Sequence, residues 1–295
     1  MDPLSSRYRD LILRMVKESS QSMEINSEDM YIPGNPKILP FIDQIIEENI
    51  QAGSGLRSFE NLEKLAELAR GGASCLLLLE HYSNFDLPVF SYLLRKNSPS
   101  GAEIEKNIVA VAGIKLSQTD PIISAFAEGY SRLVIYPSRS LEIIKNNIKD
   151  PKELVAEMMR GSSINRTAMK TLSTLKHQGK LVLVFPAGTR FRPWDPSSKR
   201  GVREIDSYLK SFDYMCLVAV KGNLLRINPE GIMREDLICP DRVLYDISEP
   251  LRCDEFRDSA KHHKHFGEDK KQAIVDSLMA SLEAMHDKLE TSVEP

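Results

Sequence analysis

Short apolar segments that alternate with helical segments are the feature that most limits how this chain can fold. Six of them lie near residues 75–80, 108–112, 133–136, 181–185, 215–221 and 242–248. Continuous apolar runs of this length are typical of strands buried on both faces, and their alternation with helices indicates βαβ units. The helix before the fourth segment is well marked, because Ile164, Ala168, Met169, Leu172 and Leu175 repeat at helical spacing and Gly179 follows. The sequence therefore predicts an α/β fold with a mostly parallel, mixed sheet flanked by helices.

The first 72 residues have a different pattern, in which helical segments follow one another without apolar strands. One predicted helix runs from Leu4 to Glu18, a second repeats apolar residues over 41–46, and a third begins at Ser58 as N-cap and ends at Gly71. The first of these carries Arg and Lys beside apolar residues; contact with anionic lipid is one interpretation, and a packed amphipathic helix is the better one. We expect two domains, a small helical one of residues 1–72 and an α/β one of residues 73–295.

The overall composition is that of an ordinary globular protein, with 42% hydrophobic and 27% charged residues. Its four cysteines are widely spaced and form no Cys-x-x-Cys pair, so we expect them to be reduced. A net charge of −3 without a broad basic stripe argues against a nucleic-acid partner. No window approaches the roughly 20 apolar residues of a membrane-spanning helix, and no secretory signal is recognisable. A soluble, cytoplasmic protein is therefore expected.

A His residue follows the first apolar strand directly, and an Asp residue lies five positions further on. These are His81 and Asp86. The carboxyl end of a strand is where an open α/β sheet places its reactive groups. A His there can accept a proton from a substrate hydroxyl if a carboxylate fixes its tautomer and stabilises the imidazolium, which Asp86 can do. The alternative interpretation is a hydrogen-bonded turn histidine without a chemical role.

Two arginines follow another apolar strand, about a hundred residues later. The turn after residues 181–185 contains Pro186, Gly188 and Thr189. Arg190 and Arg192 come next, and residues two apart in an extended stretch share a face. Their planar guanidinium groups suit a phosphate dianion. A solvated basic turn is the alternative.

Together the two motifs resemble the glycerolipid acyltransferase family, whose signature is a His-x4-Asp block followed by a Phe-Pro-x-Gly-x-Arg block. His81 and Asp86 match the catalytic pair of the family, and the turn that ends at Arg190 matches its phosphate-binding block. Membrane-bound members have Glu where this chain has Ala187. The soluble, plastid-type glycerol-3-phosphate acyltransferases lack that Glu and carry a second Arg followed by Pro, as this chain does at 192–193. The chain is more similar to this soluble branch.

The resemblance continues between the two motifs and adds two cations to the expected site. Lys115 follows the apolar segment 108–113, and Arg139 matches a Lys of the phosphate site in the soluble enzymes. The next position is Ser140, where those enzymes have a His. The resemblance therefore implies that the phosphate is bound by Lys115, Arg139, Arg190 and Arg192.

The activity implied by the resemblance is transfer of a fatty acyl group from a thioester to the sn-1 hydroxyl of glycerol 3-phosphate, which gives lysophosphatidic acid. His81 would deprotonate the hydroxyl and Asp86 would orient its imidazole, with no cofactor. The donor would be a thioester of acyl carrier protein or of coenzyme A, and peripheral contact with a membrane is a further expectation. Two alternatives stay open, a lysophosphatidate acyltransferase and a non-catalytic phosphoester- or lipid-binding protein on the same fold.

A metal site is not expected. The one dense group of histidines consists of His262, His263 and His265, and it lacks an obvious carboxylate or Cys complement. A solvated basic segment is therefore the favoured interpretation.

Overall fold

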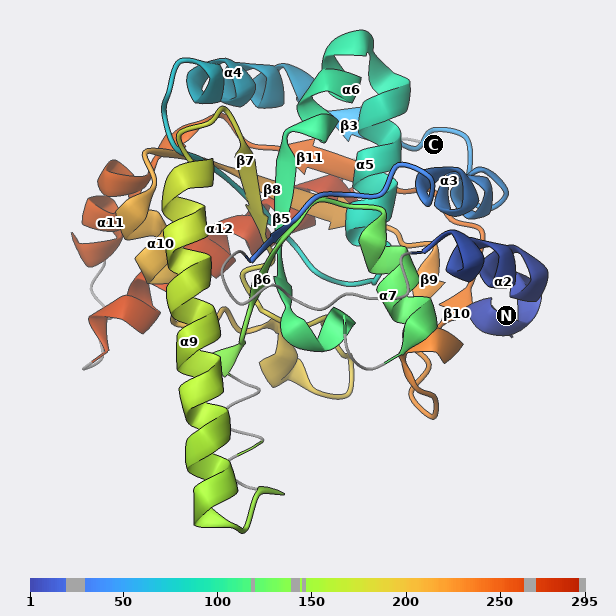
Figure 1. Cartoon of the computed structure of the whole chain (residues 1–295). Coiled ribbons are helices and arrows are strands. Elements are labelled where there is room, and N and C mark those ends of the chain that lie inside the picture. Colours follow the sequence, from blue (N-terminus) through green and yellow to red (C-terminus); the bar gives the residue numbers. More distant parts are fainter. Residues whose placement is uncertain (20–29, 118–119, 139–143, 145–146, 263–268, 292–295) are drawn as a thin grey trace. The chain divides into compact units, whose positions relative to one another are not determined.

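The computed structural model of the chain (Figure 1) describes residues 1–295 apart from 20–29, 118–119, 139–143, 145–146, 263–268 and 292–295. The described residues form two compact units, each assembled from separate stretches of sequence. Unit 1 contains residues 1–9, 42–108 and 176–295, and unit 2 contains residues 10–41 and 109–175.

Unit 1 is built on a mixed sheet. Its strands are β3 (Gly55–Arg57), β4 (Cys75–Leu79), β7 (Leu181–Val184), β8 (Tyr214–Lys221), β11 (Leu244–Ile247) and β12 (Leu251–Arg252). β4 lies parallel to both β7 and β8, whereas β11 is antiparallel to β8 and parallel to β3. All five residues of β4 are buried, as expected for an apolar strand with a neighbour on either side and both faces covered.

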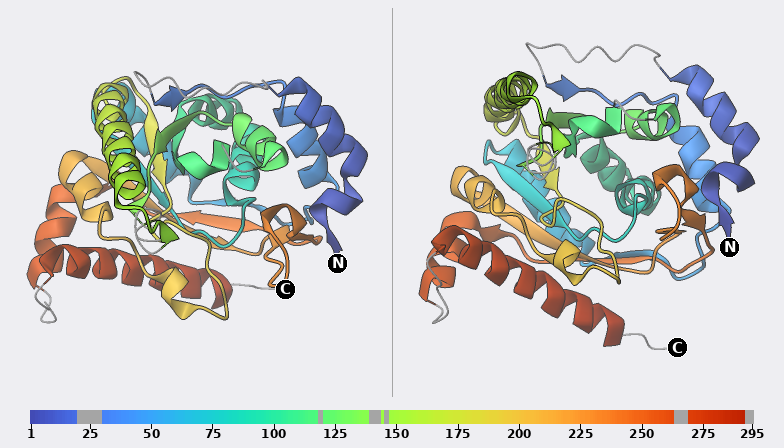
Figure 2. Two further views of the ribbon diagram at one scale, coloured as in Figure 1. Left: turned by 60° about the horizontal axis from the view of Figure 1, so that its bottom comes forward. Right: turned by 90° about the horizontal axis from the view of Figure 1, so that it is seen from below.

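Helices cover both faces of this sheet. Cys216 of β8 faces α4 (Phe59–Arg70), where its thiol lies 4.0 Å from the carbonyl oxygen of Asn61. Ala219, three positions along the same strand, packs against Leu289 of α12 (Lys270–Thr291). Residues an odd number of positions apart point to opposite faces of a strand, so α4 and α12 lie on opposite faces. Figure 2 shows α12, in red, running along its face of the strands.

The other elements of unit 1 are short. They are α1 (Leu4–Arg7), α5 (Asp86–Asn97), α6 (Pro99–Lys106), α10 (Ile205–Ser211), α11 (Cys253–His262), η2 (Pro196–Lys199), η3 (Met233–Glu235) and a small antiparallel sheet of β1 (Asp2–Pro3), β10 (Leu237–Ile238) and β9 (Leu225–Arg226). Helix α3 (Leu39–Glu47) contains the boundary between a stretch of unit 2 and a stretch of unit 1.

Unit 2 has three strands of its own and one long helix. Its elements are α2 (Arg9–Glu18), β2 (Tyr31–Ile32), β5 (Ile108–Gly113), η1 (Ile114–Ser117), α7 (Pro121–Glu128), β6 (Arg132–Ile135) and α9 (Pro151–Leu175). β6 is parallel to β5 and antiparallel to β2. Helix α9 packs on β6, and the side chain of Asn165 fixes it there by bonding both backbone groups of Tyr136 (2.8 and 2.9 Å).

The predicted fold class is confirmed, because the structure is α/β with a mixed sheet flanked by helices. Each of the six predicted apolar segments overlaps a strand, namely β4, β5, β6, β7, β8 and β11. The four cysteines are free and buried, as expected, and burial raises the pKa of Cys75 and of Cys253 to about 12. The units interleave in sequence, so the domain boundary at residue 72 stays a prediction.

Two local predictions in the first 72 residues were wrong. The helix expected over Leu4–Glu18 is broken at Tyr8, where the backbone leaves helical geometry between α1 and α2. Ser58 precedes α4 but does not cap it with its side chain, because its φ is 54° and its hydroxyl donates to Asp246 instead (2.9 Å). At Ser58 a tertiary hydrogen bond replaced the local preference.

No helix among the described residues combines the length and the apolar character needed to cross a membrane.

Candidate active site

Pairing of β4 with β7 brings the two sequence motifs together. The strands are parallel and in register from Cys75 opposite Leu181 to Leu78 opposite Val184. The segments after the two strands therefore leave the sheet at the same edge, where His81 follows β4 and Phe185 follows β7. The two rings stack with their centroids 3.9 Å apart and an angle of 21° between their planes. The backbone N–H of Phe191 also donates to the carbonyl of His81 (2.8 Å), which ties the turn to the histidine segment.

The imidazole of His81 is held by the carboxylate of Asp86. His81 Nδ1 lies 3.0 Å from Asp86 Oδ2. An ionised carboxylate only accepts hydrogen bonds, so Nδ1 carries the proton and Nε2 keeps the lone pair of the neutral ring. The His81 side chain is 17% exposed and that of Asp86 only 2%. The arrangement therefore leaves a basic nitrogen within reach of solvent and buries the group that orients it.

Asp86 is itself fixed by the backbone around it. Its Oδ2 accepts hydrogen bonds from the backbone N–H groups of Tyr82 (2.7 Å) and Ser83 (2.8 Å), and its carbonyl accepts one from Tyr245 Oη (2.7 Å). It is also the first residue of α5, where the helix dipole favours a negative charge. The five-residue spacing thus corresponds to a compact loop that begins at His81 after β4 and ends at Asp86, the first residue of α5.

The turn after β7 depends on a glycine. The N–H of Gly188 donates to the carbonyl of Phe185 (2.9 Å), with Pro186 as the first central residue of the turn. Gly188 has a φ of +64°, and a Cβ built on it would lie 3.1 Å from a methyl group of Val202. Val202 is in turn held by its N–H, which donates to the carbonyl of Pro186 (2.8 Å). The left-handed backbone conformation therefore favours glycine at this position, and the close methyl group of Val202 adds to the cost of a Cβ.

We expect Gly188→Ala to lower the free energy of unfolding by about 1 to 2 kcal/mol, the usual cost of left-handed backbone for a residue with a Cβ. Thermal or denaturant unfolding measures this loss. Gly55→Ala is the matched control, because a Cβ there has no atom within 4 Å and the backbone is not left-handed. Equal effects of the two substitutions would contradict this explanation.

Arg190 reaches a carboxylate that the sequence did not reveal. Its guanidinium forms a buried ion pair with Asp236, which follows η3. Asn84 of the histidine segment donates to the same carboxylate oxygen (3.0 Å), and the N–H of Asn228 donates to the other (3.3 Å). Asp236 is 1% exposed, and burial raises the pKa of its carboxyl despite the opposing effect of Arg190. One acidic side chain therefore connects the two motifs. The sequence around Asp236 gives no sign that this aspartate is buried or that it pairs with Arg190.

The remaining predicted cations are placed differently. Arg192 is half-buried, with its backbone N–H bonded to Ser198 Oγ (2.8 Å), and no carboxylate of the described residues pairs with its guanidinium. Thr189 is half-buried in the same turn. Lys115 lies in η1 of unit 2, and its side chain is outside the described part of the structure. Arg139 and Ser140 lie outside the described residues altogether, as do His263 and His265.

A small pocket opens beside His81. Its walls come from both motifs, from η2 and from α12, and consist of Glu80, His81, Tyr82, Pro186, Ala187, Phe191, Ser198, Lys199 and Met279. Ala187, which stands where the membrane-bound enzymes have Glu, is thus part of the wall. Lys199 is held by an ion pair with Glu283 of α12 (2.9 Å). Among the described residues, no group of His, Cys, Asp and Glu could hold a metal ion.

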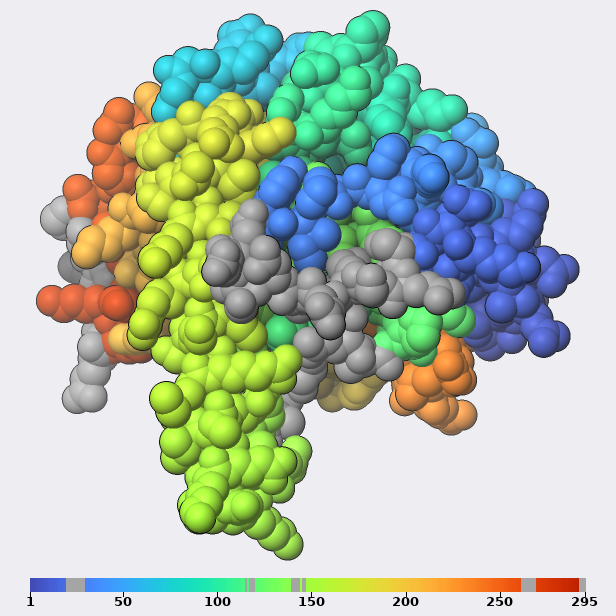
Figure 3. Space-filling model, in the orientation of Figure 1, coloured from blue at the N-terminus to red at the C-terminus, as the bar shows by residue number. Residues whose placement is uncertain are grey.

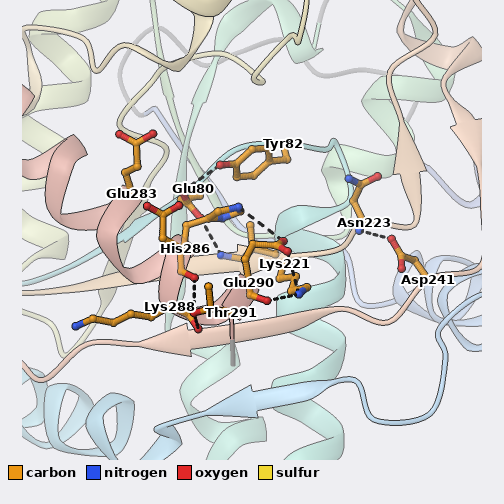
Figure 4. A network of polar contacts seen from close by, with 12 residues as sticks. Glu80, Tyr82, Lys221, Asn223, Asp241, Glu283, His286, Lys288, Glu290 and Thr291 are labelled. Carbon is orange, nitrogen blue, oxygen red and sulfur yellow. Dashed lines mark hydrogen bonds and ion pairs between the residues drawn. The ribbon is translucent and has the colours of Figure 1, made fainter. Parts of the chain in front are cut away.

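A second histidine, His286, contacts the residues on either side of His81. Nothing in the sequence indicated this contact. Figure 4 shows His286 of α12 beside Glu80 and Tyr82. Its Nδ1 lies 3.0 Å from Glu80 Oε2, which also accepts from the N–H of Val220 (3.0 Å). Tyr82 donates to the other oxygen of Glu80 (3.2 Å), and its ring stacks on His286 with centroids 5.2 Å apart. The hydrogen bond to Glu80 raises the pKa of His286.

This raised pKa predicts a pH-dependent contribution to stability. The protonated form of His286 is favoured in the folded state, so its contribution is complete below the unfolded-state pKa of about 6.5 and is lost as the pH rises through the higher folded-state pKa. We expect His286→Gln to lower the free energy of unfolding by roughly 1 to 2 kcal/mol at acidic pH and by less at alkaline pH. Denaturant unfolding across this pH range measures the difference. His177→Gln is the control, because His177 is exposed; a loss that grew with pH for His286→Gln would contradict the assignment.

The fold and the site together define an α/β enzyme in which a carboxylate-held histidine lies beside an arginine-bearing turn. Comparison with known protein families matches residues 56–235, more than half of the chain, to the Acyltransferase family. The chain therefore belongs to the acyltransferases, and the resemblance to enzymes of glycerolipid acyl transfer is confirmed at this level. No curated protein matches it. The roles of individual residues remain predictions.

Proposed function

We propose that the protein is a glycerol-3-phosphate 1-O-acyltransferase, which moves a fatty acyl group from a thioester to the sn-1 hydroxyl and forms lysophosphatidic acid. One observation carries the proposal. The His81–Asp86 pair and the turn that bears Arg190 and Arg192 leave the same edge of two paired strands and contact each other. A base for a hydroxyl and cations for a phosphate are what this acceptor requires.

The geometry suggests the following steps. His81 Nε2 takes the proton from the acceptor hydroxyl, and the oxygen forms a bond to the thioester carbonyl carbon. The carbon–sulfur bond then breaks, and the thiolate takes up the proton from the imidazolium. Asp86 keeps the ring oriented and stabilises its charged form. A thiolate leaves readily, so the reaction needs no covalent enzyme intermediate.

Holding the acceptor by its phosphate makes the hydroxyl effectively an internal group of the complex, which is where binding contributes most to rate. Arg192 has no competing carboxylate among the described residues, so it is the first candidate for this contact. Arg190 would share its guanidinium between the phosphate and Asp236. Lys115 and Arg139 remain proposed on the resemblance alone.

The donor is a thioester of acyl carrier protein or of coenzyme A, and both carry a phosphate-bearing pantetheine arm. Basic residues near the turn, Lys199 and Arg200, would suit such an acidic donor. Both form ion pairs with acidic residues of α12, Lys199 with Glu283 and Arg200 with Asp276. A donor would have to displace these carboxylates from Lys199 and Arg200, and a KM for the donor that changes with salt concentration would show this competition.

A cytoplasmic location is part of the proposal.

A direct assay tests the proposal. The purified protein is given acyl-CoA or acylated carrier protein together with glycerol 3-phosphate, with lysophosphatidate, or with no acceptor. We expect thioester consumption and a 1-acyl product with glycerol 3-phosphate. Acylation of lysophosphatidate alone would favour the alternative enzyme, and no transfer to either acceptor would favour a binding protein.

We expect Arg192→Gln to raise the KM for glycerol 3-phosphate about tenfold or more, because a hydrogen bond to a charged group is lost. Steady-state kinetics with varied acceptor at saturating donor measure the change. Arg203→Gln is the matched control, since Arg203 is exposed and paired with Asp269. An unchanged KM in Arg192→Gln would remove Arg192 from the phosphate site.

A further inference from the structure

Helix α9 of unit 2 has a buried side and an exposed side of different character. The buried side consists of Gly161, Ile164, Ala168, Leu172 and Leu175, which repeat at three- and four-residue spacing. In Figure 1 the amino-terminal half of α9 extends well beyond β6, the strand on which the helix packs. Figure 3 shows this half of the helix, in yellow-green, at the molecular surface.

The exposed side carries large apolar side chains. Val155 is 55% exposed, Met158 40%, Met159 69% and Met169 47%. The sequence pattern grouped Met169 with the apolar residues of the buried side, and this prediction was wrong. At 100° per residue these four positions fall within one arc of about 100°, whose centre lies about 130° around the helix from the centre of the buried side. They are four of the nine large hydrophobic residues that are exposed in the described part of the chain. Their concentration on one helix face is what requires an explanation.

The same arc carries cations and no carboxylate. Lys152, Arg166 and Lys170 are exposed and fall within it or at its edge. None of the three has an ion pair with a residue that the structure describes. The two acidic residues of α9 lie well outside the arc, and one of them, Glu157, is engaged by Tyr136 Oη (2.6 Å) and by Arg160 (3.4 Å). The exposed side of α9 is therefore apolar and positively charged, in a chain whose net charge is −3.

We propose that this face of α9, defined by Val155, Met158, Met159 and Met169 with Lys152, Arg166 and Lys170, binds the surface of an anionic lipid bilayer. Helices with one apolar, lysine- and arginine-bearing side lie in the interface of such bilayers, with the apolar side chains among the acyl chains and the cations at the phosphates. The long stems of Lys and Arg suit this position, because they reach back to the head groups. The convex side of a helix can lie against the flat surface of a bilayer, whereas a protein partner would need a matching groove. This face also lacks the aromatic side chains that are typical of protein interfaces.

The proposal differs from the expectation drawn from the sequence, which considered the first helix for lipid contact. Helix α2 buries its apolar residues Leu11, Ile12 and Met15 within the protein and exposes Leu13. Its apolar side is therefore already used for packing. Helix α2 is consequently the internal comparison for α9.

Sedimentation of the full chain with vesicles tests the proposal. We expect binding to vesicles of phosphatidylcholine mixed with phosphatidylglycerol, much weaker binding to phosphatidylcholine alone, and weakening by salt. Lys152→Gln, Arg166→Gln and Lys170→Gln should each lower the affinity by about fivefold. Met158→Ser together with Met159→Ser should lower it as well, while circular dichroism and thermal unfolding confirm an intact fold.

The comparison variant combines Leu13→Ser, Arg14→Gln and Lys17→Gln in α2, and it should bind as the unaltered protein does. Failure to bind anionic vesicles, equal binding by the α9 variants, or loss only in the α2 variant would overturn the proposal. Saturable binding of an acidic protein such as acyl carrier protein by this face, without vesicle binding, would overturn it too. None of these measurements depends on catalysis, so they are independent of the proposed function.

Discussion

Substitution of His81 by Ala should lower kcat for acyl transfer by about 10² to 10⁴, the usual contribution of a positioned general base. The KM for glycerol 3-phosphate should change little, because the imidazole acts on the hydroxyl while the arginines bind the phosphate. The fold should persist, since the His81 side chain is partly exposed and stacks on one neighbour, Phe185. Initial rates at varied acceptor concentration separate the two parameters.

The matched control for this experiment is His177→Ala, which removes an exposed histidine of the same unit. It should leave both kinetic parameters unchanged. If the His81→Ala protein kept most of its turnover while remaining folded, the general-base role would have to be given up. If the KM rose and kcat did not fall, His81 would be a binding residue instead.

The parts of the site that could be predicted are those that local sequence determines. His81 and Asp86 belong to a single loop, and the length of that loop fixes their contact through two backbone hydrogen bonds to the carboxylate. The apolar runs of β4 and β7 could be recognised because both strands are fully buried. The βαβ pattern predicts that such strands run parallel, but not that these two are neighbours, because β5 and β6 lie between them in the chain. Their pairing, which brings the two motifs to one edge, is known only from the structure.

The parts that could not be predicted involve partners far apart in the chain. Asp236 lies 46 positions from Arg190, and His286 lies 206 positions from Glu80. A lone Asp or His on an otherwise ordinary segment carries no periodic signal, so its partner becomes known only when the fold is known. The antiparallel placement of β11 beside β8 is of the same kind, since apolar runs do not show strand direction.

The second large effect concerns the ion pair that connects the two motifs. Arg190→Ala should lower the free energy of unfolding by about 3 to 5 kcal/mol, because it leaves a buried carboxylate without its counter-charge. Burial already raises the pKa of Asp236, and loss of Arg190 should raise it further. The folded variant would then bind a proton that the unfolded chain releases more readily, so its stability deficit should shrink as the pH falls. Denaturant unfolding at several pH values measures both effects.

Restoring neutrality distinguishes the structural role of Arg190 from its proposed role in binding. The double variant Arg190→Ala, Asp236→Asn should recover much of the lost stability, because no unpaired charge stays buried and Asn can still bond Asn84 and the backbone of Asn228. If Arg190 also binds phosphate, this folded double variant should keep a raised KM for glycerol 3-phosphate. Arg203→Ala, which breaks the exposed pair with Asp269, should have little effect on stability. A double variant as unstable as Arg190→Ala alone would show that the loss comes from packing of the arginine side chain and not from the charge left on Asp236.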